Sequence, residues 1–187
     1  MKKTSIASAC ALSISVMAAH ASLNYQLNQS IGIGSVTGTI TTDGTFGVLS
    51  SGNITDWNLV INNGSATFDL LGPLSGNNSA IYLVGSDLTA TSANLLFNFS
   101  DSTPGAGLLL QNPYIGSDEN WFAVEAALDG VGGVASSENL VVGVGTGSQQ
   151  SFVQTGVEPI ASVPEPTTLA LVGLSGLATF MGIRRRK

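Results

Sequence analysis

The sequence of 187 residues has few basic, cysteine and histidine residues, and it places all of them near its two ends. Its six lysines and arginines stand at positions 2, 3 and 184–187, its cysteine at 10 and its histidine at 20. Between residues 22 and 183 the charged side chains are therefore all acidic. Nothing in that stretch can neutralise phosphates, so the composition excludes nucleic acid as a partner.

The absence of histidine and cysteine from residues 22–183 also limits the available chemistry. It excludes a His-based triad, a thiol nucleophile, a zinc site with the usual ligands and a structural disulfide. General acid and base work would depend on carboxylates alone. We therefore expect no cofactor, and we expect core packing and strand pairing to hold the fold together. The anionic surface repels acidic lipids and acidic glycans, so it would bind them only through a bridging divalent cation.

The N-terminus has the pattern of a secretory signal peptide. Two lysines near the start precede a mostly small and apolar stretch at 6–19, and Ala19 and Ala21 occupy the small-x-small cleavage positions. We expect residues 1–21 to be the signal peptide, with the cut after Ala21. Lipidation at Cys10 is disfavoured because too little apolar sequence precedes it.

Residues 22–154 have the pattern of one all-β domain, a single β-sandwich or a jelly-roll-like fold. Short apolar runs are separated by Gly, Asn, Ser and Thr at close intervals, which predicts about nine or ten strands. The clearest local prediction is a hairpin whose apolar residues alternate on both sides of a turn at 62–64. Its core-facing residues are Trp57, Leu59, Ile61, Ala66, Phe68 and Leu70. Residues 121–127 are predicted to form a strand in preference to a helix, because they begin with Trp, Phe, Ala and Val.

Residues 155–166 are predicted to be a linker because they contain Gly156, Pro159, Pro164 and Pro166. Each proline disfavours helix in the residue before it, so this segment should be extended and accessible.

The C-terminal segment has the composition of a short membrane helix with a basic end. Residues 167–183 contain no charge, Asn, Gln or Pro. At about 1.5 Å per residue this run is just long enough to cross a bilayer core of roughly 30 Å. The run ends in the basic residues Arg184, Arg185, Arg186 and Lys187. Positive charge marks the cytoplasmic side, which places the body of the chain outside. Residues 167–187 are therefore predicted to be a transmembrane helix with a basic tail.

The order of a short polar motif, a brief apolar helix and a terminal arginine cluster resembles the PEP-CTERM sorting signal. Val163, Pro164, Glu165 and Pro166 carry the motif, and the whole resemblance covers residues 162–187. It implies recognition by an exosortase-type membrane protease and transient anchoring in the inner membrane through residues 167–183. The protease would remove the helix and release the body to the cell surface or extracellular matrix of a Gram-negative bacterium that makes exopolysaccharide. A permanently anchored single-pass protein is the alternative.

A second, looser resemblance concerns three segments of the body. Residues 38–44, 47–49 and 54–59 are similar to a stretch that recurs in many PEP-CTERM surface proteins of unassigned activity. This resemblance agrees with the first one and implies no mechanism.

Several acidic motifs admit a chemical interpretation and a plainer one. Turns at Asp43, 101–107 and Asp129 suggest calcium loops, but none has the spacing of an EF-hand, and Asp-Gly is a common turn dipeptide. Asp118, Glu119 and Glu125 lie beside Trp121, which would suit a glycosidase, but the residues between them favour packing.

Five sequons, at Asn28, Asn53, Asn63, Asn77 and Asn98, leave glycosylation open.

The resulting hypothesis is an exported, non-enzymatic protein of the cell surface or exopolysaccharide matrix, with the exosortase and an exopolysaccharide as partners. The Thr- and Asn-rich strand faces would hydrogen-bond hydrated polysaccharide, a role that comes mainly from the resemblance. The alternative from another class is a secreted carbohydrate-acting enzyme that uses Asp and Glu only, for which no catalytic pair can be named.

Overall fold

A computed structural model describes residues 21–100, 105–112, 119–126, 136–143 and 148–164 of the chain. This part is all-β, and its one helical element is a single 3-10 turn, η1 (Ser51–Asn53). The strands are β1 (Leu23–Ile31), β2 (Gly34–Thr42), β3 (Gly47–Val48), β4 (Ile54–Asn62), β5 (Thr67–Leu71), β6 (Ala80–Val84), β7 (Leu88–Ala90), β8 (Asn94–Asn98), β9 (Gly107–Asn112), β10 (Asn120–Glu125), β11 (Ser137–Val142), β12 (Ser148–Val153) and β13 (Val157–Ser162).

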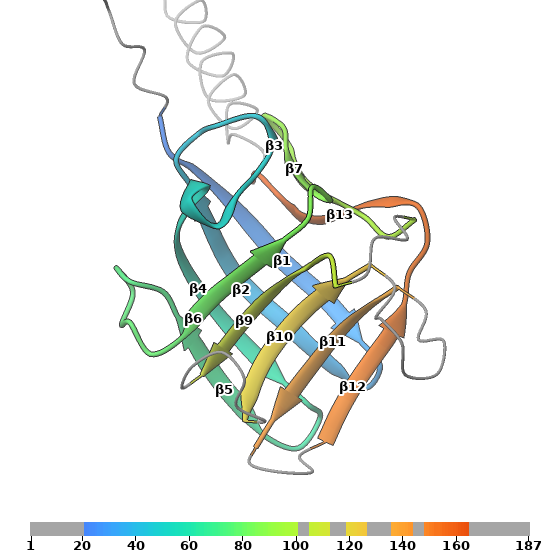
Figure 1. The fold of residues 1–187 in the computed structure, drawn as a ribbon. Coiled ribbons are helices and arrows are strands. Elements are labelled where there is room, and N and C mark those ends of the chain that lie inside the picture. The colour runs from blue at the N-terminus through green and yellow to red at the C-terminus, as the bar shows by residue number, and fades with distance from the viewer. Residues whose placement is uncertain (1–20, 101–104, 113–118, 127–135, 144–147, 165–187) are drawn as a thin grey trace, which may run out of the picture.

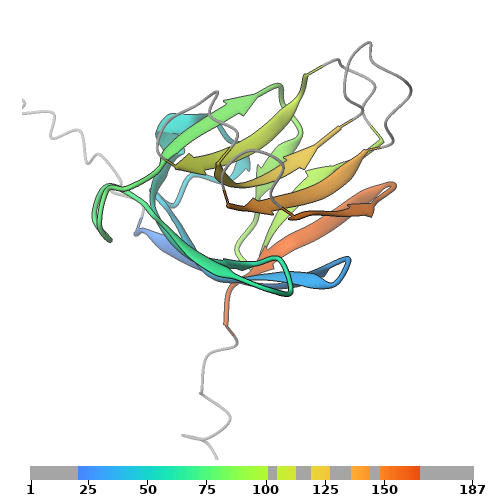
Figure 2. The same cartoon turned by 90° about the horizontal axis from the view of Figure 1, so that it is seen from below.

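The strands form two antiparallel sheets that lie face to face (Figures 1 and 2). The larger sheet has the order β3-β7-β8-β13-β1-β2-β4-β5, and the smaller has the order β12-β11-β10-β9-β6. The prediction of an all-β fold is confirmed. Thirteen strands in the described residues exceed the predicted nine or ten, chiefly because β1, β7 and β13 were not expected.

The core lies between the sheets. Alternate residues of β1, β4 and β8 are buried in it, as the pleat of a strand requires, whereas all six residues of β11 are buried. The largest fully buried side chains of the core include Tyr25, Leu27, Ile31, Ile40, Leu59, Ile61, Leu70, Leu95, Phe97, Leu108 and Phe122. Two polar atoms within this core have partners: the Tyr25 hydroxyl donates to the Thr91 carbonyl at 2.6 Å, and the Trp57 indole N–H donates to the Ser79 hydroxyl at 2.7 Å. Trp57 is therefore a packing residue, as expected.

The predicted hairpin is formed by β4 and β5, with Ile61 opposite Phe68. Most of its expected core-facing residues are buried or partly buried against the core, but Ala66 precedes β5 and is exposed. The predicted strand over 121–127 corresponds to β10, which pairs with β9 and β11.

The predicted linker at 155–166 is wrong over half its length, because residues 157–162 form β13. This strand lies inside the larger sheet between β8 and β1. Pro159 lacks a backbone N–H, and the register between β13 and β8 shifts between Pro159 and Ala161. The irregularity accommodates a proline that would otherwise interrupt a central strand. The β domain thus extends beyond the expected boundary at residue 154.

Among the described residues no helix has the length and apolar character needed to cross a bilayer. The predicted signal peptide, apart from Ala21, and the predicted membrane helix at 167–183 lie outside those residues.

Gly38, in the middle of β2, is required by the close approach of β4. Its φ is +132°, and a Cβ placed there would lie 2.0 Å from the Asn58 carbonyl oxygen and 2.9 Å from the Leu59 Cα. Gly47 also has a positive φ, +89°, but no atom lies within 4 Å of its hypothetical Cβ. Gly47 therefore provides a control that has the backbone strain without the clash.

We expect Gly38→Ala to lower the free energy of unfolding by about 3 kcal/mol and Gly47→Ala by about 1 kcal/mol. Urea denaturation of the two variants measures both values. Equal losses of unfolding free energy would show that β2 and β4 can move apart at Gly38 without destabilising the fold.

Candidate functional site

The larger sheet is nearly divided where β1 meets β13. These strands pair at one position only, Gln26 with Ser162. By contrast, β1 pairs with β2 at nine positions and β13 pairs with β8 at five. Beyond the Gln26 pair the two strands separate, and an open groove lies between them.

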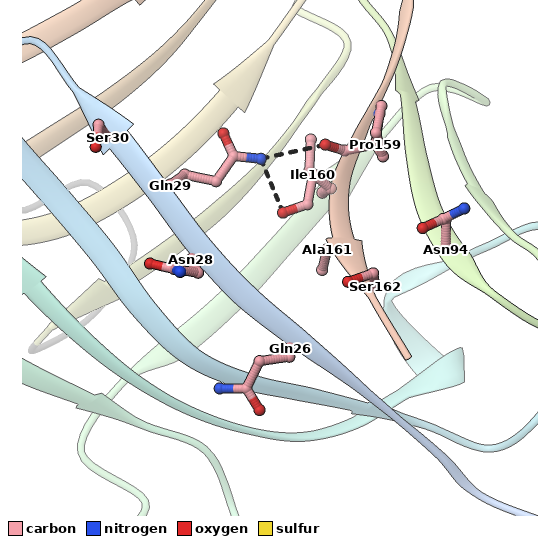
Figure 3. Close-up of a pocket in the computed structure, with 9 residues that line it drawn as sticks. All are labelled: Gln26, Asn28, Gln29, Ser30, Asn94, Pro159, Ile160, Ala161 and Ser162. Carbon is pink, nitrogen blue, oxygen red and sulfur yellow. Dashed lines mark hydrogen bonds between the residues drawn. The ribbon is translucent and has the colours of Figure 1, made fainter. Parts of the chain in front are cut away.

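The groove has a volume of about 570 Å³ and is lined by side chains of β1, β8 and β13 (Figure 3). Its lining residues are Gln26, Asn28, Gln29, Ser30, Asn94, Pro159, Ile160, Ala161 and Ser162. None of these side chains is charged, and six of the nine carry an amide or a hydroxyl. The lining therefore offers both hydrogen-bond donors and acceptors and has no net charge.

Gln29 spans the gap between the separating strands. Its position in the alternation of β1 is that of the buried residues Leu27 and Ile31. Its side-chain amide donates to the carbonyl oxygens of Pro159 at 3.3 Å and Ile160 at 2.9 Å (Figure 3). One side chain thus replaces part of the backbone pairing that β1 and β13 lack, which satisfies two acceptors at the floor of the groove.

The groove was not predicted, because β1 was not expected as a strand and β13 was expected to be a linker. One signal was available in the sequence. Buried Tyr25, Leu27 and Ile31 alternate with exposed polar residues at 24, 26, 28 and 30, which is the pattern of a strand with one wet face. The separation from β13 had no such signal, because it depends on pairing between residues about 130 positions apart.

The structure does not bring the suggested glycosidase carboxylates together. Glu119 directly precedes β10 and Glu125 ends it. Six positions of extended chain span about 20 Å, well beyond the 5–10 Å that glycosidase carboxylates require. Trp121 is half-buried, and Asp118 lies outside the described residues. In the part of the chain that the structure describes, no three acidic, histidine or cysteine side chains gather into a possible metal site.

Glu125 is half-buried and accepts a hydrogen bond from the Asn139 side-chain amide at 3.4 Å. Burial raises the pKa of its carboxyl. It borders a small pocket of about 160 Å³ together with Tyr82, Gly105 and Leu109. No second described carboxylate lines this pocket.

Glu138 is a buried carboxyl that the sequence did not single out. It lies opposite Val124 in the β10–β11 pair and faces the core, and its side chain is 1% exposed. One oxygen, Oε2, accepts from the Gln154 amide at 3.5 Å, and among the described residues Oε1 has no hydrogen-bond partner. Burial raises the pKa of this carboxyl to about 7. This carboxyl belongs to the interior of the fold and does not line the groove.

The turn at Asp43 has a structural role within the described residues. Its carboxylate accepts from the Thr45 backbone N–H at 2.9 Å and from the Asn53 amide at 3.0 Å. These hydrogen bonds lower the pKa of the Asp43 carboxyl. Of the sequon residues, Asn63 is buried and donates to the Val142 carbonyl. The other suggested calcium turns lie largely outside the described residues, and calcium and glycosylation stay predictions.

The polar motif begins directly after the last strand. β13 ends at Ser162, and the Val163 backbone N–H donates to the Ala93 carbonyl at 2.6 Å. Val163 also packs against the core, whereas Pro164 is exposed. Glu165, Pro166 and the basic cluster at 184–187 lie outside the described residues.

A scan against known families matches residues 162–187 to the model described as the PEP-CTERM protein-sorting motif. The predicted sorting signal is thus confirmed over the same residues. The motif implies an exported protein that is transiently anchored in a membrane of a Gram-negative bacterium and processed by an exosortase, a membrane protease. No curated protein and no solved structure matches this chain.

Proposed function

We propose that this chain is a non-enzymatic protein of the cell surface or exopolysaccharide matrix. Its tail holds it in the inner membrane through residues 167–183 until the exosortase cleaves within residues 163–166. The observation that carries the proposal is the match of residues 162–187 to the sorting motif, which starts at the last residue of β13. Because the motif adjoins the domain so closely, cleavage there releases the complete β domain.

The groove between β1 and β13 supports a binding role for that domain. Gln26, Asn28, Asn94 and Ser162 present amides and a hydroxyl around an open space, a chemistry that suits the many hydroxyl groups of a polysaccharide. Residues 22–183 contain no positive charge, so an acidic polysaccharide would be repelled. The ligand we propose is therefore a neutral polysaccharide.

Processing is tested by the location and terminal mass of the protein in cells with and without the exosortase. With the enzyme, we expect extracellular protein that has lost residues 167–187. A Pro164→Ala, Pro166→Ala double variant should stay in the membrane with its basic tail, because the extended motif is altered. Pro73→Ala changes an exposed proline elsewhere and should be processed normally. Extracellular protein that retains Arg184 to Lys187 would contradict the proposal.

Polysaccharide binding is tested by affinity electrophoresis against a neutral glucan, galactan and mannan, with alginate as the acidic comparison. We expect a Gln26→Ala, Asn28→Ala variant to bind the preferred neutral polymer at least fivefold more weakly, a loss of about 1 kcal/mol or more. The matched control is Asn58→Ala, Thr67→Ala, which removes exposed polar groups from β4 and β5. Equal binding by both variants would exclude the groove, and shortening of the polymer would contradict the non-enzymatic assignment.

A further inference from the structure

The end of the sandwich from which the chain leaves β13 carries two exposed apolar residues. Phe46 and Val48 are 53% and 57% exposed. They flank Gly47 at the start of β3, which is the edge strand of the larger sheet. They belong to the same end as the C-terminal exit, because Gly47 pairs with Ala90, directly before the β7–β8 turn. Ala93 lies in the β7–β8 turn, and its carbonyl oxygen accepts the hydrogen bond from the Val163 backbone N–H.

The connection from this end to the apolar tail is short. Three residues, at 164–166, separate Val163 from the start of the apolar run at Thr167. Fully extended, the chain from Val163 to Thr167 spans at most about 14 Å. The headgroup layer occupies about 5–8 Å of that distance on each side of the hydrocarbon core. When the tail lies in the membrane, the exit end of the sandwich is therefore held close to the bilayer surface.

We infer that Phe46 and Val48 rest on the lipid surface while the tail anchors the chain. This inference depends on the tail anchoring proposed above. Figure 1 shows β3, the β7 end of the sheet and the start of β1 together at this end of the molecule. The anchored domain then stands upright on the membrane, with the β1–β2 turn at its far end.

The charge at this end determines which lipid fits. Asp43 lies in the turn before Phe46, its carboxylate stays ionised through its hydrogen bonds to Thr45 and Asn53, and no lysine or arginine occurs in residues 22–183. An anionic headgroup would be repelled, so the surface fits lipids without net charge, with the aromatic ring of Phe46 at the headgroup level. The contact is temporary, because removal of the tail removes the tether.

Single-cysteine labelling tests the inference, since the sequence has one natural cysteine, at position 10. The full chain carrying Cys10→Ser would be produced in a Gram-negative host without an exosortase and reconstituted into phosphatidylcholine liposomes. Phe46→Cys and Val48→Cys place an environment-sensitive fluorophore at the proposed contact. Ile33→Cys, in the β1–β2 turn and 78% exposed, is the matched control, about 25 Å away along β1.

We expect lipid-attached nitroxides to quench the labels at 46 and 48 at least twofold more than the label at 33. Addition of anionic lipid to the liposomes should not increase this quenching. Equal quenching at the three positions in chains that float with the liposomes would overturn this inference alone. Failure of the full chain to float would overturn the tail anchoring and the inference with it. Protection of labels 46 and 48 in detergent without lipid would assign the surface to a second copy of the chain instead.

Discussion

A chain ending after Gly156 will fail to fold, whereas a chain ending after Pro164 will keep the whole β domain folded. The two truncations differ by eight residues, which contain β13. Circular dichroism and urea denaturation of the two secreted proteins measure the difference. We expect a cooperative transition for the longer chain and no transition for the shorter one.

The reason is the position of β13 between the two halves of the larger sheet. β13 pairs with β8 at five positions and with β1 at one, and it buries Ile160 and Ala161 to 1% and 5% exposure. Without it, β3, β7 and β8 lose their link to the rest of the sheet, and the Gln29 amide loses both acceptors. Burial of one isoleucine alone contributes about 2–3 kcal/mol, against a total stability of about 5–15 kcal/mol.

A folded chain ending at Gly156 would show that the domain does not need β13 in order to fold. Partial unfolding of a chain ending at Pro164 would show instead that the tail contributes to stability. If the released protein is to stay folded, the processing enzyme can cut only downstream of β13. Val163 is itself hydrogen-bonded to Ala93, which leaves the segment from Pro164 onward for cleavage.

Glu138→Gln will make the protein more stable at pH 8 than the wild type and will remove part of its pH dependence. The pKa of Glu138 rises from the usual 4.5 to about 7 in the fold. Below pH 4.5 the carboxyl is protonated in both the folded and unfolded states, so its ionisation does not change the free energy of unfolding. Between pH 4.5 and 7 unfolding releases its proton, so the free energy of unfolding falls by about 1.4 kcal/mol per pH unit. Above pH 7 the full loss, roughly 3 kcal/mol, is present.

The measured quantity is the difference in unfolding free energy between Glu138→Gln and wild type from pH 4 to 8. We expect this difference to change by about 3 kcal/mol in favour of the variant as pH rises. The difference cancels other carboxyls, including Asp43, whose lowered pKa acts in the opposite direction. A difference for Glu138→Gln that stays flat over this pH range would show that water or another donor solvates the buried oxygen.

The sequence by itself determined the properties that depend on local pattern and composition. The sorting motif at 162–187 is a contiguous signal, and the family scan confirms it at the same residues. The all-β class and the β4–β5 hairpin follow from the alternation of apolar residues around Asn-Gly, because the side-chain period of a strand is local. The absence of His, Cys and basic residues from 22–183 needed no structure at all.

Only the tertiary structure decided where strands distant in the sequence meet. Proline and glycine at 156–166 predict a linker, yet β13 is a central strand because β8 and β1 supply partners that local sequence does not reveal. The groove exists because β1 and β13 pair at a single position, and the burial of Glu138 follows from the register of β11 against β10. Pairing register between distant segments depends on the whole packed core, and it therefore decides features that no short pattern encodes.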